Sequence, residues 1–237
     1  MTGSAQTETG YSSPVDLVAA HSGRFSRELG IDVSEGDDGE LFKWFLAAVL
    51  FGARISERLA ARTYRAFAER KLITPEAIIE CGWNGLVAVL DAGGYARYDF
   101  KTATKLLDMS RSLLEHYRGS LSTLHSQAES AEDLEQKLTA LAKGIGSTTV
   151  NIFLRELRGA WSKAAPSLSD PAIDAAKSLN FLSDEQDQRE LALTRLQEIW
   201  ARAGGSLRDF SDFETALVRK GLSLRRAKAH RLKTADQ

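Results

Sequence analysis

Two glycines, Gly144 and Gly146, stand where two apolar helical runs meet, and their surroundings carry the clearest chemical signal in this chain of 237 residues. The first run ends at Lys143. The second places apolar side chains at i, i+3, i+4 and i+7, namely Val150, Phe153, Leu154 and Leu157. A turn this short needs backbone conformations that glycine adopts at little cost. The second helix begins with free N–H groups and a positive dipole end, which suit a phosphate.

The C-terminal segment Val218–Gln237 concentrates positive charge, although the formal net charge of the chain is only −1. Its basic residues are Arg219, Lys220, Arg225, Arg226, Lys228, Arg231 and Lys233. A local basic segment can attract phosphates that the total charge conceals. A solvated C-terminal helix explains the same composition, so both interpretations stay open.

Cysteine content and hydropathy exclude several classes of protein. The single cysteine, Cys81, rules out a disulfide within the chain and an iron–sulfur cluster held by four cysteines. The first thirteen residues lack the apolar core of a signal peptide, and no apolar run is long enough to cross a bilayer. We therefore expect a cytoplasmic protein.

Helix-start signals and apolar periodicity predict an all-α fold, because no useful segment alternates at period two. The run Leu41–Phe51 is apolar nearly all round, so it should lie at the centre of a core. Residues 1–13 are polar and should be disordered. The expected helices cover about 14–29, 41–51, 57–70, 75–80, 83–90, 99–117, 130–142, 148–157, 170–179, 183–203 and 211–220.

The segment Leu141–Leu157 resembles the helix-hairpin-helix motif of the endonuclease III-like (HhH-GPD) superfamily of DNA glycosylases. The family hairpin reads apolar–x–Gly–apolar–Gly–x–x–Thr–Ala–Asn–apolar, and the match here is Gly144-Ile-Gly-Ser-Thr-Thr-Val-Asn-Ile152. Three further stretches agree in order. Leu41–Glu57 is similar to the first helix and turn of the family's helical barrel. Gly94–Ala103, with Tyr98 and Lys101, resembles its Gly-x-Tyr-x-x-Lys-Ala segment, and Asp170 falls where it carries a catalytic aspartate.

This resemblance covers residues 41–180 and implies a two-lobed helical fold with DNA bound across the cleft between the lobes. One lobe would be a six-helix barrel of residues 41–161, which includes the hairpin. The other would combine residues 14–40 with residues 162–237, and the protein would be a monomer.

The resemblance assigns phosphate binding to the hairpin. The backbone N–H groups of Gly144, Gly146 and Ser147 would hold a DNA phosphate, with Thr148 and Lys143 as further contacts. A monovalent cation, Na⁺ or K⁺, often sits at the hairpin backbone in this family. Such a contact positions DNA without reading its sequence. The alternative is a tight helix–helix connection inside a core.

Asp170 is the implied catalytic residue, with Asp174 one turn later as the reserve. Cleavage of an N-glycosidic bond builds positive charge on the sugar, which a nearby carboxylate stabilises. Asp before Pro is also an ordinary helix start. Thr148 occupies the position where some members carry a nucleophilic lysine, and threonine cannot form an imine. We therefore expect a monofunctional enzyme, without lyase activity.

Base flipping requires side chains that fill the gap left in the stack. The matching positions are Arg54, after the first barrel helix, and Tyr95 or Arg97, before the Gly-x-Tyr helix. Arg54 is equally suited to a surface phosphate contact or a salt bridge. Trp44 and Trp161 are candidates to line the damaged-base pocket, although core packing is the better-supported role for both.

The expected function is therefore a monofunctional DNA glycosylase of base excision repair, acting on duplex DNA with a damaged base and associated with the nucleoid. No cofactor is expected beyond the hairpin cation, and the family's common cysteine cluster is absent. One alternative is a non-catalytic helix-hairpin-helix protein that binds DNA structure or abasic sites. Another is a purely structural all-α protein. Alkylated, deaminated and oxidised bases all remain open as substrates.

Overall fold

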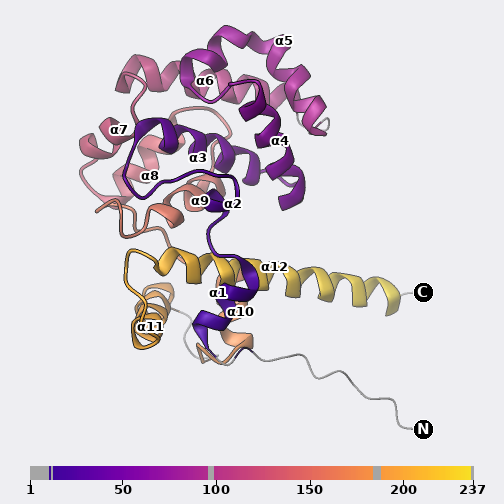
Figure 1. Cartoon of the computed structure of the whole chain (residues 1–237), viewed down its shortest axis with the longest axis vertical. Coiled ribbons are helices and arrows are strands. Elements are labelled where there is room, and N and C mark those ends of the chain that lie inside the picture. The colour runs from indigo at the N-terminus through magenta and orange to yellow at the C-terminus, as the bar shows by residue number, and fades with distance from the viewer. Residues whose placement is uncertain (1–10, 12, 96–98, 184–187, 236–237) are drawn as a thin grey trace. The chain divides into compact units, whose positions relative to one another are not determined.

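The computed structural model describes residues 11, 13–95, 99–183 and 188–235. Over these residues the chain forms twelve α-helices and no β-strand, which confirms the expected all-α class (Figure 1). None of the helices described there is long and apolar enough to cross a membrane. The helices are α1 (Pro14–His21), α2 (Phe25–Glu28), α3 (Asp38–Phe51), α4 (Glu57–Glu69), α5 (Pro75–Gly93), α6 (Asp99–Tyr117), α7 (Leu121–Gln127), α8 (Ala131–Ala140), α9 (Ser147–Leu157), α10 (Asp170–Ser178), α11 (Arg189–Arg202) and α12 (Phe210–Ala235).

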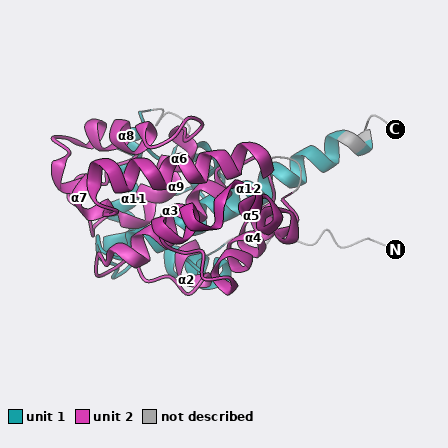
Figure 2. Cartoon of the chain, turned by 90° about the horizontal axis from the view of Figure 1, so that it is seen from above, with its two compact units in different colours: residues 1–24, 167–237 teal, residues 25–166 magenta. Residues whose placement is uncertain are grey.

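The chain divides into two compact units, coloured separately in Figure 2. Unit 2 is the continuous segment 25–166 and holds α2 to α9. Unit 1 joins residues 1–24 with residues 167–237, so it holds α1 together with α10, α11 and α12. The expected terminal lobe of residues 14–40 and 162–237 therefore has different boundaries: residues 25–40 and 162–166 belong to unit 2. The expected disordered tail, residues 1–13, lies largely outside the described residues.

Helix α3 is the centre of unit 2, as its apolar composition predicts. Every side chain from Trp44 to Leu50 is buried. The Asp37 carboxylate caps the helix by accepting the N–H of Glu40. Helix α9 packs against it, with the rings of Phe45 and Phe153 edge to face at 4.9 Å between centroids. Because α9 carries the second half of the hairpin, this contact anchors the hairpin to the core.

Residues 25–40 join unit 2 because a buried carboxylate holds them there. Glu156 of α9 is 1% exposed and accepts the N–H groups of Phe25 at 2.8 Å and Ser26 at 3.0 Å, which begin α2. Burial raises the pKa of this carboxyl, while Arg155 and the two N–H donors act in the opposite direction. Phe25, Ile31 and Val33 then pack in the same core as α3.

Unit 1 is built around α12. Helix α10 crosses it at Gly221, where a Cβ would overlap the carbonyl of Pro171. The aromatic rings of Trp200 and Phe213 stack at 5.4 Å and 10°. Glycine at position 221 therefore allows the start of α10, including Asp170, to approach α12 closely.

Three helix predictions need correction. The expected helix 14–29 is broken because Ser22 and Gly23 both adopt positive φ, at 65° and 63°. Helix α7 was not expected, yet Ser120 caps it by accepting the N–H of Thr123. The last helix does not end near Lys220 but continues to Ala235, and its side chains from Arg225 to Leu232 are all exposed. The sequence beyond Gly221 contains no proline or glycine to stop it.

Candidate nucleic-acid interface

The hairpin forms where the two glycines predict it, between α8 and α9. Gly144 has φ of +92°, a left-handed conformation that other residues adopt only with strain. Gly146 has φ −113° and ψ 177° and precedes the first residue of α9. Ile145 between them is 3% exposed and fixes the turn to the core. Lys143, Gly144, Gly146, Ser147 and Thr148 are all exposed, so the residues assigned to phosphate binding share one accessible turn.

The N-terminus of α9 is open. Within the described parts of the chain, α1, α3, α4, α5, α7 and α8 each have a side chain that accepts an N–H of the first turn. Gly146 has no side chain to do so at α9. A Cβ at Gly146 would have no atom within 4 Å, so the approach is also sterically clear. An external anion can therefore take the place that a capping side chain takes elsewhere.

Lys105 of α6 lies beside the turn, and the sequence patterns did not identify it. A Cβ on Gly144 would lie 3.2 Å from Lys105 Cε and 3.7 Å from its Nζ. Burial lowers the pKa of this half-buried lysine. No carboxylate among the described residues forms an ion pair with it. Only the packing of α6 against the turn reveals it, because 39 positions of sequence separate the two residues.

The turn that carries Arg54 also contacts the hairpin helix. Gly52, two residues earlier, approaches α9 so closely that a Cβ would overlap the Thr149 hydroxyl. Arg54 is exposed. The structure therefore brings this predicted wedge residue close to the first turn of α9, within unit 2.

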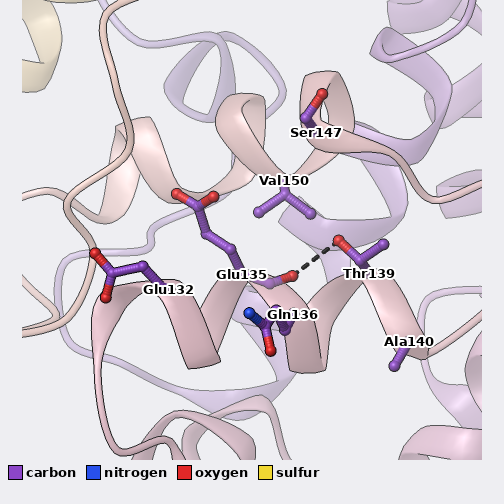
Figure 3. A pocket seen from close by; sticks show the side chains of 7 residues that line it. All are labelled: Glu132, Glu135, Gln136, Thr139, Ala140, Ser147 and Val150. Atoms are coloured by element: carbon purple, nitrogen blue, oxygen red, sulfur yellow. Dashed lines mark hydrogen bonds between the residues drawn. The ribbon is translucent and has the colours of Figure 1, made fainter. Parts of the chain in front are cut away.

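A hollow that Ser147 also lines has acidic walls, which do not suit DNA. It encloses about 500 Å³ and is lined by α8 residues together with Ser147 and Val150 (Figure 3). Two of its lining residues, Glu132 and Glu135, are acidic, and both are labelled in Figure 3. Burial, assisted by Glu132, raises the pKa of Glu135. The acidic hollow itself is therefore unsuited to a phosphate.

The two other wedge candidates differ from Arg54. Tyr95 is only 2% exposed, and its phenolic oxygen accepts a hydrogen bond from Thr102 at 3.4 Å. A wedge must be accessible, so Tyr95 does not fit that role in this conformation. Arg97 lies outside the described residues.

Both tryptophans expected near a base pocket are core residues of unit 2. Trp44 is fully buried, and its indole N–H donates to the carbonyl of Phe153 at 3.1 Å. Trp161 is 7% exposed and stacks on His125 at 4.4 Å between ring centroids. Neither presents a ring face to a ligand, because neighbouring side chains already cover them. Both residues pack in the core of unit 2, and the prediction that they line a damaged-base pocket is corrected.

Asp170 is the first residue of α10 and its side chain is 61% exposed. Its Oδ1 accepts a hydrogen bond from Arg189, which also donates to the carbonyl of Leu168. The hydrogen bond from Arg189 holds the pKa of Asp170 below its ordinary value. The carboxylate is therefore ionised at neutral pH, as the predicted role needs, but it already has a cationic partner. That partner is also half exposed, so the ion pair is screened by water and breaks at little cost.

The reserve candidate, Asp174, has a similar partner. Its Oδ2 accepts a hydrogen bond from Arg225 Nε of α12 at 2.8 Å and forms an ion pair with Arg225 Nη2 at 2.7 Å. Asp174 and Asp170 both lie on α10, one turn apart. Unit 1 therefore presents two carboxylates, each paired with an arginine.

Comparison with known proteins gives no family assignment. No family model matches the chain, and no curated protein matches it either.

Proposed function

We propose that this protein is a monofunctional DNA glycosylase that binds duplex DNA through the hairpin and hydrolyses the glycosidic bond of a flipped, damaged base with Asp170. The observation that carries the proposal is the open, exposed N-terminus of α9 with a lysine beside it. Phosphate groups bind at uncapped helix N-termini because the N–H groups and the dipole both favour an anion. The two-lobed arrangement of the HhH-GPD glycosylases belongs to the same proposal, which the ordered matches over residues 41–180 support.

The exposed backbone at Gly144 and Gly146 is compatible with a monovalent cation bound by carbonyl oxygens of the turn. Such a cation, held by the backbone of Gly144 and Gly146, would supply positive charge for a DNA phosphate. Thr148 is exposed at the position of the lysine in bifunctional members. Because it supplies no amine, the product would be an intact strand with an abasic site.

One observation favours the non-catalytic alternative. Arg189 neutralises the carboxylate that would have to stabilise a cationic sugar, and this arrangement also serves a purely structural helix start. In that case the protein would bind DNA structure or abasic sites through the same hairpin. The two functions share the hairpin and differ only in what Asp170 does.

Substitution of Asp170 by Asn separates them. Duplexes that each carry one alkylated, deaminated or oxidised base are incubated with excess protein, and base release is followed in a single turnover. We expect the wild type to release at least one of these bases. The Asp170→Asn variant should then lose at least about a hundredfold in rate, with unchanged DNA affinity, because an electrostatic contact to the transition state is lost.

Asp174→Asn is the matched control, since it removes a similarly exposed, arginine-paired carboxylate on the same helix. It should retain the wild-type rate. Equal rates for wild type and Asp170→Asn would remove the catalytic assignment. DNA binding without release of any base would favour the non-catalytic protein.

A further inference from the structure

Trp83 and Phe100 form an exposed pair of aromatic rings on unit 2. The first belongs to α5 and the second to α6, helices that lie side by side in the contacts of this unit. Their ring centroids are 5.2 Å apart with 33° between the planes. They are 39% and 58% exposed, and in the described part of the chain no other ring pair has both members this accessible. Large apolar groups left in water at neighbouring positions commonly mark a binding surface.

The pair is held in place although it is not buried. Trp83 directly follows Gly82, whose φ of +67° and ψ of 171° interrupt α5. The indole N–H of Trp83 donates to the Thr104 hydroxyl at 3.1 Å. That hydroxyl in turn donates to the carbonyl of Phe100 at 3.0 Å. The indole is thereby oriented by the same helix that carries its partner ring.

Helix α6 connects this ring pair to the hairpin. Thr104 contacts Trp83, and the next residue, Lys105, lies against Gly144 of the turn. The side chains of successive helix residues point about 100° apart. The ring pair and the hairpin turn therefore lie against neighbouring faces of α6 at the same height along the helix. A strand held by its phosphate at the hairpin would therefore reach the ring pair within a few nucleotides.

The charges around the pair favour an anionic chain. Lys101 is exposed one turn before Lys105, and no ion pair neutralises either lysine among the described residues. Two nearby carboxylates have partners: Asp99 accepts the backbone N–H of Phe100 itself, and Asp108 lies 4.0 Å from Arg111. Glu80, on the preceding part of α5, lines a separate hollow with Arg70 and Lys71.

We propose that Trp83 and Phe100 form a stacking platform for an unpaired base of the DNA that the hairpin holds. This inference rests on the proposed DNA binding by the hairpin. It adds a preference for DNA containing unstacked bases, such as a bulge or the partner opposite an abasic site. Aromatic side chains stack on any base, and each such contact contributes measurably to affinity. Lysines beside exposed rings match a DNA strand, in which phosphates alternate with bases, better than they match an apolar peptide.

The test compares two fluorescent duplexes of one sequence, one fully paired and one with a single unpaired base. Wild-type protein should bind the second more tightly. Trp83→Ala should weaken binding to the duplex with the unpaired base by about 5- to 150-fold, the usual range for loss of one stacked base. It should leave binding to the paired duplex unchanged, because the hairpin and its lysine are untouched.

Phe100→Ala provides a second variant, since the Phe100 ring is more exposed and its removal leaves the Trp83 hydrogen bond in place. Trp83→Phe keeps a ring and should restore most of the preference. Leu191→Ala, which removes a comparably exposed apolar side chain from unit 1, should behave as wild type. Circular dichroism and melting temperature verify that each variant is folded.

The outcomes separate the platform from the function on which it rests. If the wild type binds neither duplex, the DNA-binding proposal fails. If the wild type binds both and the two alanine variants match it on both, the platform alone is overturned. An equal loss on both duplexes would also overturn it, because a general contact or a partner protein would then explain the exposed rings.

Discussion

The starts of α9 and α10 are two helix N-termini that lack a capping side chain, and they differ in charge. Gly146 precedes α9 and leaves its first turn open, with Lys105 close to the turn. Ser169 precedes α10 and makes no capping hydrogen bond either, but the helix itself begins with a carboxylate. Asp170 brings negative charge to the positive end of its own helix dipole, and Arg189 balances it.

Under the proposed glycosylase function, this difference would assign phosphate binding to α9 and charge stabilisation to α10. A helix that supplies no anion of its own is suited to receive one from DNA. A helix that carries an ionised carboxylate is suited to stabilise positive charge, provided that its arginine can move aside. Exchanging or removing these features at α9 and α10 tests the comparison.

The largest effect is expected from giving α9 the carboxylate that α10 has. Gly146→Asp fits the extended backbone at this position and meets open space. The new carboxylate would accept the free N–H groups of the first turn and repel phosphate. We expect DNA affinity, measured by fluorescence anisotropy, to fall by about ten- to a hundredfold, while melting temperature changes little, since glycine is itself an acceptable N-cap.

Gly146→Asn is the matched control, because it caps the helix without charge. Its loss of affinity should be clearly smaller than that of Gly146→Asp. Unchanged affinity in the aspartate variant would show that the hairpin does not bind phosphate.

The next largest effect is expected on stability, from disturbing the close contact between α10 and α12 that positions Asp170. A Cβ introduced by Gly221→Ala would overlap the Pro171 carbonyl, so α10 must move away from α12. We expect the free energy of unfolding, measured by chemical denaturation, to fall by about 1–3 kcal/mol, as for other overpacked contacts. Gly204→Ala tests a glycine of the same unit with no neighbouring atom, although its φ of +90° adds local backbone strain. A stable Gly221→Ala protein would mean that the helices adjust freely there.

The smallest effect on stability is expected from Arg189→Met. The pair is about half exposed, so its removal should cost less than about 1 kcal/mol at neutral pH. Arg189 lowers the pKa of Asp170 in the folded protein. The ion pair therefore stabilises the fold fully at pH values above the pKa of Asp170 in the unfolded chain. This stabilisation is lost as the pH falls through the pKa of Asp170 in the folded protein, below about pH 4.

The same variant gives a pH test of catalysis. Without Arg189 the pKa of Asp170 rises toward its ordinary value. The acidic limb of the base-release profile should therefore move to higher pH, while release near neutral pH is retained or increased. An acidic limb that does not move would indicate that Asp170 is not the titrating group.

Local patterns in the sequence were sufficient for features that depend on neighbours along the chain. The glycine spacing located the hairpin turn, and the apolar run Leu41–Phe51 located the central helix. Distant contacts were not accessible in this way. The proximity of Gly52 to Thr149, of Lys105 to Gly144 and of Gly221 to Pro171 depends on how helices pack. Tyr95 and Trp44 were assigned to a site by position alone, and packing placed both in the core.

The discontinuous composition of unit 1 has a consequence for how the protein is made. Helix α1 is synthesised well before α12, the helix against which it packs. At ordinary rates of synthesis the interval between them is about 10 to 40 s. During that interval unit 2, which is continuous in sequence, has all of its residues available for folding. The nascent chain would therefore complete the hairpin before α1 can pack against α12, so unit 2 would fold before unit 1.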